Sequence, residues 1–279
     1  MHPLVRQIRE ALHGVYSDAE ALSLAKMLLV DVFGFSTLEL YGGKDRSFSE
    51  KEQTQLADIV GRLQHHEPIQ YIIGVETFMG LVFEVDENVL IPRPETQELV
   101  EWILEDHRSD SHCRILDIGT GSGCIPVALA RSMSDFELEA WDISDGALEV
   151  SKRNAKRNDV NVLFRKQNVL EAVPSALCYD VIVSNPPYIT EKEKVDMEAN
   201  VLDWEPSIAL FVPDSDPLLF YRKIAELGLK MLVPDGSLYL EINRAYGEMM
   251  KSMLEDMGYR YVELRKDMFG NDRMIKAIK

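Results

Sequence analysis

The fold is decided by the stretch Arg114-Ile115-Leu116-Asp117-Ile118-Gly119-Thr120-Gly121-Ser122-Gly123. Its apolar first half predicts a buried strand that runs into a Gly-x-Gly-x-Gly turn, and residues Cys124 to Ser132 predict the helix that follows. Glycines let the backbone turn tightly and approach a ligand closely, while a helix N-terminus presents unpaired N–H groups. A dinucleotide fingerprint would need glycine where Cys124 stands, and no Gly-Lys-Ser/Thr follows as in a P-loop. The stretch therefore predicts a strand, turn and helix that bind a different ligand.

An acid next to the turn indicates which ligand. Asp117 stands two residues before the first glycine, where a carboxylate would repel a pyrophosphate and attract an ammonium group. The turn resembles motif I of the class I S-adenosylmethionine-dependent methyltransferases, whose cofactor carries a cationic amino-acid end. The resemblance implies that the cofactor is bound by Asp117, Gly119, Thr120, Gly121, Ser122 and Gly123.

The next two strands of the pattern fit the same cofactor. Residues Phe136 to Asp142 predict a strand that ends in an acid about 20 residues past the glycine turn, the usual distance for a carboxylate that binds ribose hydroxyls. Such an acid is commonly a helix cap, but the order of elements favours the ribose role. The following strand leads to Asn168 and Val169. Related methyltransferases commonly have an Asp at position 168 that accepts from the adenine amino group, and we expect Asn168 to accept through its carbonyl oxygen.

A second motif, Asn185-Pro186-Pro187-Tyr188, follows the apolar run from Asp180 to Ser184. Proline has no backbone N–H, so two in succession end a parallel strand and leave a ledge of carbonyl oxygens beside a carboxamide and an aromatic ring. Such a ledge can hold a planar –NH2 group by its hydrogens, with Tyr188 stacked on the attached π-system. A plain Pro-Pro turn is the alternative. Because the glycine motif is also present, we predict that Asn185, Pro186, Pro187 and Tyr188 are catalytic and bind the substrate. We also expect Asn185 to contact the cofactor.

Composition restricts the partners. The net charge is −17 and the pI is near 4.8, which favours a protein or small-molecule substrate over a nucleic acid. The basic residues Lys152, Arg153, Lys156 and Arg157 recur at helical spacing and predict a solvated helix face. No apolar stretch reaches the roughly 18 residues of a membrane span, and charges interrupt any signal peptide. The three scattered cysteines indicate a reducing, cytoplasmic environment, and the six histidines lack zinc spacing, so we expect no metal.

The chain divides into three predicted parts. Residues 1–73 read as short amphipathic helices, including one from Asp18 to Phe33 and one opened by a Ser49–Glu52 capping box. Residues 74–93 read as a β-hairpin linker. Residues 94–279 alternate strand and helix, which predicts an α/β, doubly wound, mostly parallel sheet. Two successive strands at residues 259–264 and 273–278 predict an antiparallel edge pair at its C-terminal end.

Placed together, these motifs resemble the HemK/PrmC family of peptide chain release factor N5-glutamine methyltransferases. The similarity spans nearly the whole chain, and the sequence departs from the family pattern at Asn168, while Trp204 lies where the family is variable. The asparagine-proline loop alone is only moderately specific, because amino-methylating DNA enzymes share it. The other matching segments are Glu67-Pro68-Ile69-Gln70-Tyr71-Ile72-Ile73-Gly74, Ile91-Pro92-Arg93-Pro94-Glu95-Thr96, Glu205-Pro206 and Gly270-Asn271-Asp272-Arg273.

The resemblance implies a fold, a reaction and a partner. The fold would be a seven-stranded Rossmann-like methyltransferase sheet preceded by a helical substrate-docking domain. The reaction would methylate the glutamine of the Gly-Gly-Gln motif in bacterial class I release factors, without direct binding of nucleic acid or membrane. Alternatives are a ribosomal protein glutamine, the adenine amine of a nucleic acid, or a non-catalytic cofactor sensor. Arg93 either contacts the substrate or pairs with a nearby acid, and Glu205 either contacts the substrate or caps the turn after Pro206.

Overall fold

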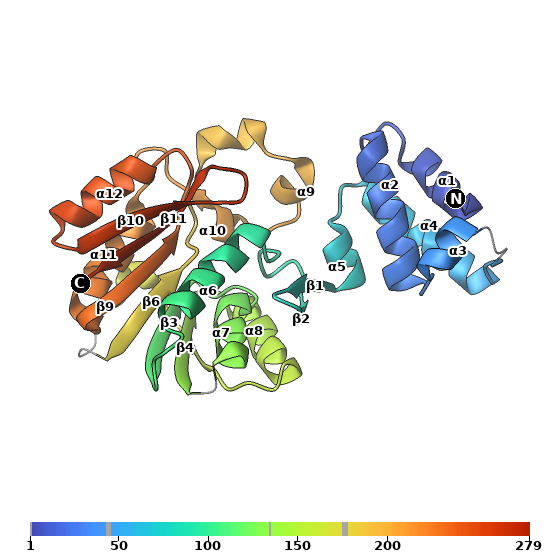
Figure 1. Ribbon diagram of the computed structural model, residues 1–279. Helices are drawn as coiled ribbons and strands as arrows, with labels where there is room; N and C mark the ends of the chain where they lie inside the picture. The colour runs from blue at the N-terminus through green and yellow to red at the C-terminus, as the bar shows by residue number, and fades with distance from the viewer. Residues whose placement is uncertain (1, 43–45, 134, 175–177) are drawn as a thin grey trace. The chain divides into compact units, whose positions relative to one another are not determined.

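The computed structural model describes residues 2–42, 46–133, 135–174 and 178–279 (Figure 1). Contacts divide the chain into two compact units. The smaller contains Met1–Gly74 together with Glu198–Trp204, and the larger contains Val75–Met197 and Glu205–Lys279. The segment Glu198–Trp204 lies far along the sequence from the other helical residues, and no sequence pattern predicted its place. Within the part of the chain described, no helix is both long and apolar enough to cross a membrane.

The smaller unit is helical and has its own core. Its core residues recur at helical spacing, as Val5, Ile8 and Leu12 do in α1. The predicted capping box is confirmed, with Ser49 and Glu52 side chains each accepting from the other's backbone N–H. The helix predicted to reach Phe33 changes to a π-helical turn after Met27, closed by a bond from the Phe33 N–H to the Leu28 carbonyl. The helices are α1 (Pro3–Leu12), α2 (Asp18–Met27), η1 (Leu28–Val32), α3 (Thr37–Gly42), α4 (Glu50–Gln64), α5 (Ile69–Ile73) and α9 (Ala199–Leu202).

The predicted β-hairpin consists of β1 (Val75–Phe78) and β2 (Leu81–Glu84), which pair antiparallel. It belongs to the larger unit and is fastened to α8 (Asp145–Arg157). Asn154, which is fully buried, accepts from the Glu84 N–H at 2.6 Å and donates to the carbonyls of Glu84 and Ser122, both at 2.9 Å. One carboxamide thus ties the hairpin to the glycine turn.

The basic residues of α8 are only partly a solvated face. Arg153 pairs with Glu84 and Asp86 at 2.8 and 3.2 Å, and Arg157 pairs with Glu84 at 3.2 Å. The prediction of a solvated face missed these partners because they lie about 70 residues earlier in the chain. The positive charges of Arg153 and Arg157 are therefore neutralised by acids of the hairpin segment and are not available to bind a nucleic acid.

The larger unit contains the predicted doubly wound sheet (Figure 1). Seven strands lie in the order β10-β11-β9-β6-β3-β4-β5. The five strands from β9 to β5 are parallel, β11 runs antiparallel to β9, and β10 pairs antiparallel with β11, which confirms the predicted terminal pair. The strands are β3 (Cys113–Ile118), β4 (Phe136–Asp142), β5 (Leu163–Lys166), β6 (Tyr179–Ser184), β9 (Leu232–Glu241), β10 (Arg260–Lys266) and β11 (Asp272–Ile278).

Helices cover both faces of this sheet. Alternate residues of β3 point to opposite faces, so Ile115 packs with α6 and α7 while Leu116 packs with α11 and α12. The two resulting cores leave no face of the sheet open, as expected for parallel strands. The helices are α6 (Pro94–Asp106), α7 (Cys124–Ser132), α11 (Leu219–Met231) and α12 (Gly247–Asp256), with shorter elements η2 (Val169–Glu171), β7 (Ile189–Thr190), η3 (Glu191–Asp196), α10 (Ser207–Leu210) and β8 (Phe211–Val212).

The pairing of β3 with β6 positions the two predicted motifs. Ile118 is the register partner of Ser184, and the Ser184 hydroxyl donates to the Ile118 carbonyl at 2.5 Å. Gly119 and Asn185 are the next residues of the two strands, so the glycine turn and the asparagine-proline loop begin side by side. This is the carboxyl edge of the parallel strands, where open α/β sheets bind their ligands.

We predict that Asn154→Ala lowers the free energy of unfolding by about 2–4 kcal/mol, because it leaves several buried backbone groups without partners. Asn158→Ala is the matched control. It lies one helical turn later and also bonds to the hairpin, through the Val82 carbonyl at 3.1 Å, but in an exposed position. Urea unfolding of both variants checks the prediction, and equal losses of stability would contradict it.

Candidate active site

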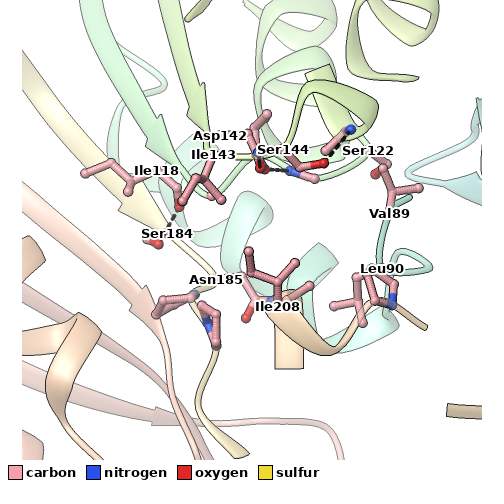
Figure 2. Close-up of a pocket in the computed structure, with 18 of the residues that line it drawn as sticks. Val89, Leu90, Ile118, Ser122, Asp142, Ile143, Ser144, Ser184, Asn185 and Ile208 are labelled. Atoms are coloured by element: carbon pink, nitrogen blue, oxygen red, sulfur yellow. Dashed lines mark hydrogen bonds between the residues drawn. The ribbon is translucent and has the colours of Figure 1, made fainter. Parts of the chain in front are cut away.

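A cavity of about 330 Å³ opens at the carboxyl edge of the sheet. Ligand pockets commonly begin near this size and are mostly apolar with a few polar groups. Figure 2 shows Asp142 and Ser144 on one side of it and Asn185 and Ile208 across from them. Of the predicted site residues, the lining includes Arg93, Gly119, Thr120, Gly121, Ser122, Asp142, Asn168, Val169, Asn185, Pro186 and Pro187. It does not include Asp117, Gly123, Tyr188 or Glu205.

The glycine turn forms one wall. Gly121 has φ +53° and donates its N–H to Asp142 Oδ2 at 2.9 Å, which fixes the turn to the end of β4. Gly123 also has a positive φ, of +80°, and in addition a Cβ built there would lie 3.0 Å from the Ser151 Cβ. Its missing side chain allows α7 and α8 to pack closely beneath the turn. Both positions favour glycine for backbone conformation, and Gly123 also requires it for space.

Two further predicted cofactor residues lie on the same wall. Both Asp142 carboxylate oxygens accept backbone N–H groups, from Gly121 and, at 2.9 Å, from Ser144. Burial raises the pKa of Asp142 above its ordinary value. Asn168 caps η2, and its Oδ1 accepts from the Leu170 N–H at 3.1 Å. A carboxylate or amide oxygen can accept more than one hydrogen bond, so neither residue has used its full capacity.

Asp117 lies behind the turn rather than in the cavity. It is fully buried, and neither of its carboxylate oxygens has a hydrogen-bond partner among the described residues. The buried hydroxyl of Thr120, a lining residue, also has none there. Burial, with a smaller contribution from the charge of Asp142, raises the pKa of Asp117 to about 7, and the neighbouring Thr120 hydroxyl opposes that rise. Unpartnered buried acceptors of this kind indicate a missing donor.

The asparagine-proline loop forms the opposite wall. The Asn185 Nδ2 donates to Thr96 Oγ1 at 3.1 Å, and Thr96 donates to Glu241 Oε2 at 2.6 Å. Thr96 lies in the first turn of α6, and Glu241 is the last residue of β9. Both are almost completely buried, each with a relative exposure of 2%. The sequence did not identify Thr96 or Glu241 as site residues. The only available signals were the place of Thr96 after Pro-Arg-Pro-Glu and of Glu241 at a strand end.

Tyr188 has a different position from the one predicted. Tyr188 does not line the cavity, whereas the prediction put its ring against a substrate amide in that cavity. Instead its hydroxyl donates to Glu241 Oε1 at 3.2 Å, and its carbonyl accepts from Asn243 Nδ2 at 3.1 Å. Asn243 also donates to Glu193, whose carboxylate holds Thr190 in a capping box. The loop turns Tyr188 inward because these buried polar groups anchor its far end.

Arg93 and Glu205 pair with each other. The Glu205 carboxylate also accepts from the Ile91 N–H at 3.3 Å, and its side chain is 1% exposed. Burial raises the pKa of Glu205, and the charge of Arg93 opposes that rise. A substrate contact of Glu205 is therefore disfavoured, because its oxygens already have partners and it lies behind the lining. The capping role after Pro206 is also absent, since α10 begins without a side-chain cap. Arg93 remains at the cavity wall, held by this ion pair.

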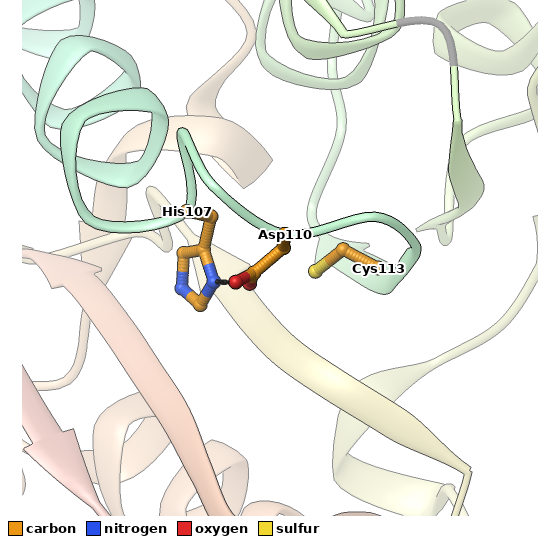
Figure 3. Close-up of side chains that lie close together, drawn as sticks. All are labelled: His107, Asp110 and Cys113. Carbon is orange, nitrogen blue, oxygen red and sulfur yellow. Dashed lines mark hydrogen bonds and ion pairs between the residues drawn. The ribbon is translucent and has the colours of Figure 1, made fainter.

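A separate group of side chains has the residue types of a metal site. His107, Asp110 and Cys113 bring three potential ligand atoms within 4.8 Å of one another (Figure 3). However, His107 Nδ1 and Asp110 Oδ2 are 2.7 Å apart, closer than the roughly 3.3 Å between two ligands of a tetrahedral zinc ion. Burial raises the pKa of the Cys113 thiol to about 12, so it is not a thiolate near neutral pH. We interpret the group as a histidine–aspartate pair at the end of α6.

Family models match both units. Residues 3–74 match the PrmC N-terminal domain, and residues 96–203 match the methyltransferase small domain. The solved structure of the hMettl16 catalytic domain bound to an RNA hairpin aligns with a TM-score of 0.59 at 18% identity, covering 92% of this chain and 90% of that one. A methyltransferase from Pyrococcus furiosus aligns with a TM-score of 0.52 at 19% identity, covering 83% and 99%. At these identities the likeness establishes the fold alone.

Curated relatives match over the full length. The release factor glutamine methyltransferase of Bacteroides thetaiotaomicron is 49% identical over 278 residues, covering 99% of each chain. Those of Flavobacterium psychrophilum and Clostridium acetobutylicum are 41% and 34% identical and cover at least 96% of each chain. The chain thus belongs to the release factor glutamine methyltransferase family and is an enzyme that uses S-adenosylmethionine as its methyl donor.

Proposed function

We propose that this enzyme methylates the side-chain amide nitrogen of the glutamine in the Gly-Gly-Gln motif of class I peptide chain release factors. One observation carries the proposal. Asn185, Pro186 and Pro187 line the same cavity as the glycine turn and Asp142. A group that orients an –NH2 and a site for the methyl donor therefore share one space. The names of the full-length relatives supply the protein substrate.

The residues of the glycine wall fit the methyl donor. Thr120 lines the cavity and Asp117 is buried behind the turn, and their side-chain oxygens have no hydrogen-bond partner among the described residues, so a cationic amino group that reaches the turn would supply the missing hydrogens and charge. Asp142 and Asn168 also line the cavity, and in this proposal Asp142 binds the ribose hydroxyls and Asn168 the adenine amino group. Bound S-adenosylmethionine supplies an electrophilic methyl group, whose bond to sulfur breaks as the amide nitrogen's lone pair forms the new N–C bond. We propose these residues as the binding set.

The loop wall makes the substrate amide reactive by orientation. An amide nitrogen is a poor nucleophile, because its lone pair is delocalised into the carbonyl. Hydrogen bonds from its two N–H groups to Asn185 Oδ1 and the Pro186 carbonyl would favour pyramidalisation and direct the lone pair at the methyl group. Prolines suit this task because they present acceptors without competing donors. Positioning of this kind can supply roughly 7–11 kcal/mol of the barrier.

No side chain is needed as a general base before transfer. The nitrogen becomes acidic once methylated and releases its proton to water. Tyr188 and Glu241 are engaged with each other, and Glu241 does not line the cavity. Neither is placed to remove a proton from the substrate.

We propose that the helical unit docks the release factor. A single glutamine side chain offers little recognition surface compared with the roughly 800 Å² per partner of a stable protein interface. The unit matches the PrmC N-terminal domain and carries no part of the cavity lining. The acidic balance of the chain and the neutralised basic residues of α8 support a protein substrate over the adenine alternative.

The substrate is tested by incubating the protein with methyl-labelled S-adenosylmethionine and, separately, a release factor, a ribosomal protein fraction and RNA. We expect label in the release factor on the tryptic peptide that contains Gly-Gly-Gln. A release factor with that glutamine changed to alanine is the matched control and should take no label. Label on a ribosomal protein or on adenine, with none on the release factor, would overturn the proposed substrate while leaving the methyltransferase intact.

We predict that Asn185→Ala lowers kcat by about a hundredfold or more and leaves the affinity for S-adenosylhomocysteine nearly unchanged, because Asn185 orients the substrate amide. Single-turnover methylation and calorimetric binding check the two quantities separately. A collapse of cofactor binding with kcat retained would identify Asn185 as a cofactor ligand instead.

We predict that cofactor binding depends on the ionisation of Asp117. With a pKa of about 7 in the free protein, Asp117 is mostly neutral below that pH, and a bound cation favours its charged form. Affinity for S-adenosylhomocysteine should therefore rise between about pH 5.5 and about pH 7 and level off above, with proton release on binding. Calorimetry in buffers of different ionisation enthalpy measures both. Asp117→Asn should weaken binding and flatten the profile; the same slope in that variant would assign it to another group.

A further inference from the structure

We propose that Thr96 and Glu241 are positioning residues that fix which end of the Asn185 carboxamide faces the cavity. The buried Glu241 carboxylate sets the direction of a hydrogen-bond chain through Thr96, so that Asn185 presents its carbonyl oxygen to the substrate. The inference rests on the proposed function, because only an incoming –NH2 group requires an acceptor at that point.

The direction of the chain follows from counting protons. A hydroxyl has one proton to donate. The Thr96 hydroxyl gives that proton to Glu241 Oε2 at 2.6 Å, so towards Asn185 it can only accept. The group facing it at 3.1 Å must then be the Asn185 NH2, as observed. Asn185 Oδ1 is left for the cavity that this residue lines.

Glu241 is the end of the chain because it only accepts. Its second oxygen receives the Tyr188 hydroxyl at 3.2 Å, so both oxygens face donors. Burial raises the pKa of Glu241, and that rise is opposed by the hydrogen bonds from Thr96 and Tyr188 and by the positive charge of Arg273, which pairs with Asp267 at 3.1 Å. A carboxylate with both oxygens facing hydroxyl donors fixes the direction of these hydrogen bonds, whereas a carboxamide in its place could donate as well as accept.

The opposite orientation of Asn185 is penalised by the same geometry. Turning the carboxamide round would bring Oδ1 against the Thr96 oxygen with no proton between them. Thr96 cannot supply one without leaving Glu241, which is buried and would lose a partner. The NH2 group would also face the substrate –NH2, donor against donor. These hydrogen bonds thus orient the Asn185 carbonyl oxygen before the substrate binds, so the acceptor is pre-organised.

Thr96→Val removes the hydroxyl with little change in shape, and Thr96→Ser keeps it. We expect Thr96→Val to lower kcat by about 10- to 100-fold with little change in S-adenosylhomocysteine affinity, and Thr96→Ser to restore most of that loss. Thr54→Val, at an exposed helix position of the other unit, controls for the exchange itself. A loss equal in the Ser and Val variants would overturn the role of the hydroxyl.

A double-mutant cycle tests whether Thr96 acts through Asn185. In the Asn185→Ala background, Thr96→Val should cause almost no further loss of kcat, because the group it orients is gone. Losses that multiply would show that Thr96 acts independently of Asn185 and would overturn the inference.

Hydrogen exchange of the Asn185 side-chain amide decides the orientation without any substrate. In protein labelled with nitrogen-15 at asparagine, the Asn185 NH2 should exchange slowly in the wild type and in Thr96→Ser. Exchange should be much faster in Thr96→Val and faster in Glu241→Gln, whose NH2 can donate to Thr96 and reverse the chain. Unchanged protection in both would overturn the inference. Absence of label on a release factor would instead overturn the proposed substrate and leave this measurement decisive.

Discussion

The register between β3 and β6 is the constraint on which the site depends. Ile118 pairs with Ser184, and the Ser184 hydroxyl reinforces the pairing with a bond to the Ile118 carbonyl. A slip of one residue would reverse the facing of every side chain on one strand and move the apolar residues of β6 into the opposite core, where they would not match the packing. Because Gly119 and Asn185 each follow a paired residue, the register that fills the cores also brings the two walls of the cavity together. The register of β3 and β6 therefore determines both the packing of the cores and the geometry of the site.

Three buried acids, Asp117, Glu205 and Glu241, lie around the site. Asp117 accepts no hydrogen bond from any residue that the structure describes, Glu241 accepts from two hydroxyls, and Glu205 pairs with Arg93. Burying a carboxylate is costly unless hydrogen bonds or charges compensate it. Glu241 and Glu205 are compensated within the protein and act as anchors for the two loops around the cavity. Asp117 is not compensated in this way, which supports the proposal that it contributes to ligand binding and not to holding the structure.

Local patterns made much of this structure predictable. The strand, glycine turn and helix at residues 113–132, the hairpin and the Ser49 capping box each depend on neighbours within a few residues, so the sequence pattern contains them. The chain from Asn185 to Thr96 to Glu241 joins residues 89 and 145 positions apart, and no periodicity carries that information. The inward turn of Tyr188 escaped prediction for the same reason, because Glu241 and Asn243 determine it from a distant strand end.

The loop chemistry also limits what the cavity can select. In the proposed mechanism Asn185 and the prolines bind a planar group that carries –NH2, a description that fits a glutamine amide and an adenine amine equally. Discrimination between them must then come from surfaces outside the cavity. In this chain Arg153 and Arg157 of α8 are paired with acids of the hairpin segment, whereas no described residue of the helical unit lines the cavity. Affinity for the macromolecule and activation of its nitrogen are therefore separable: changes in the helical unit should act on KM, and changes in the Asn185 chain on kcat.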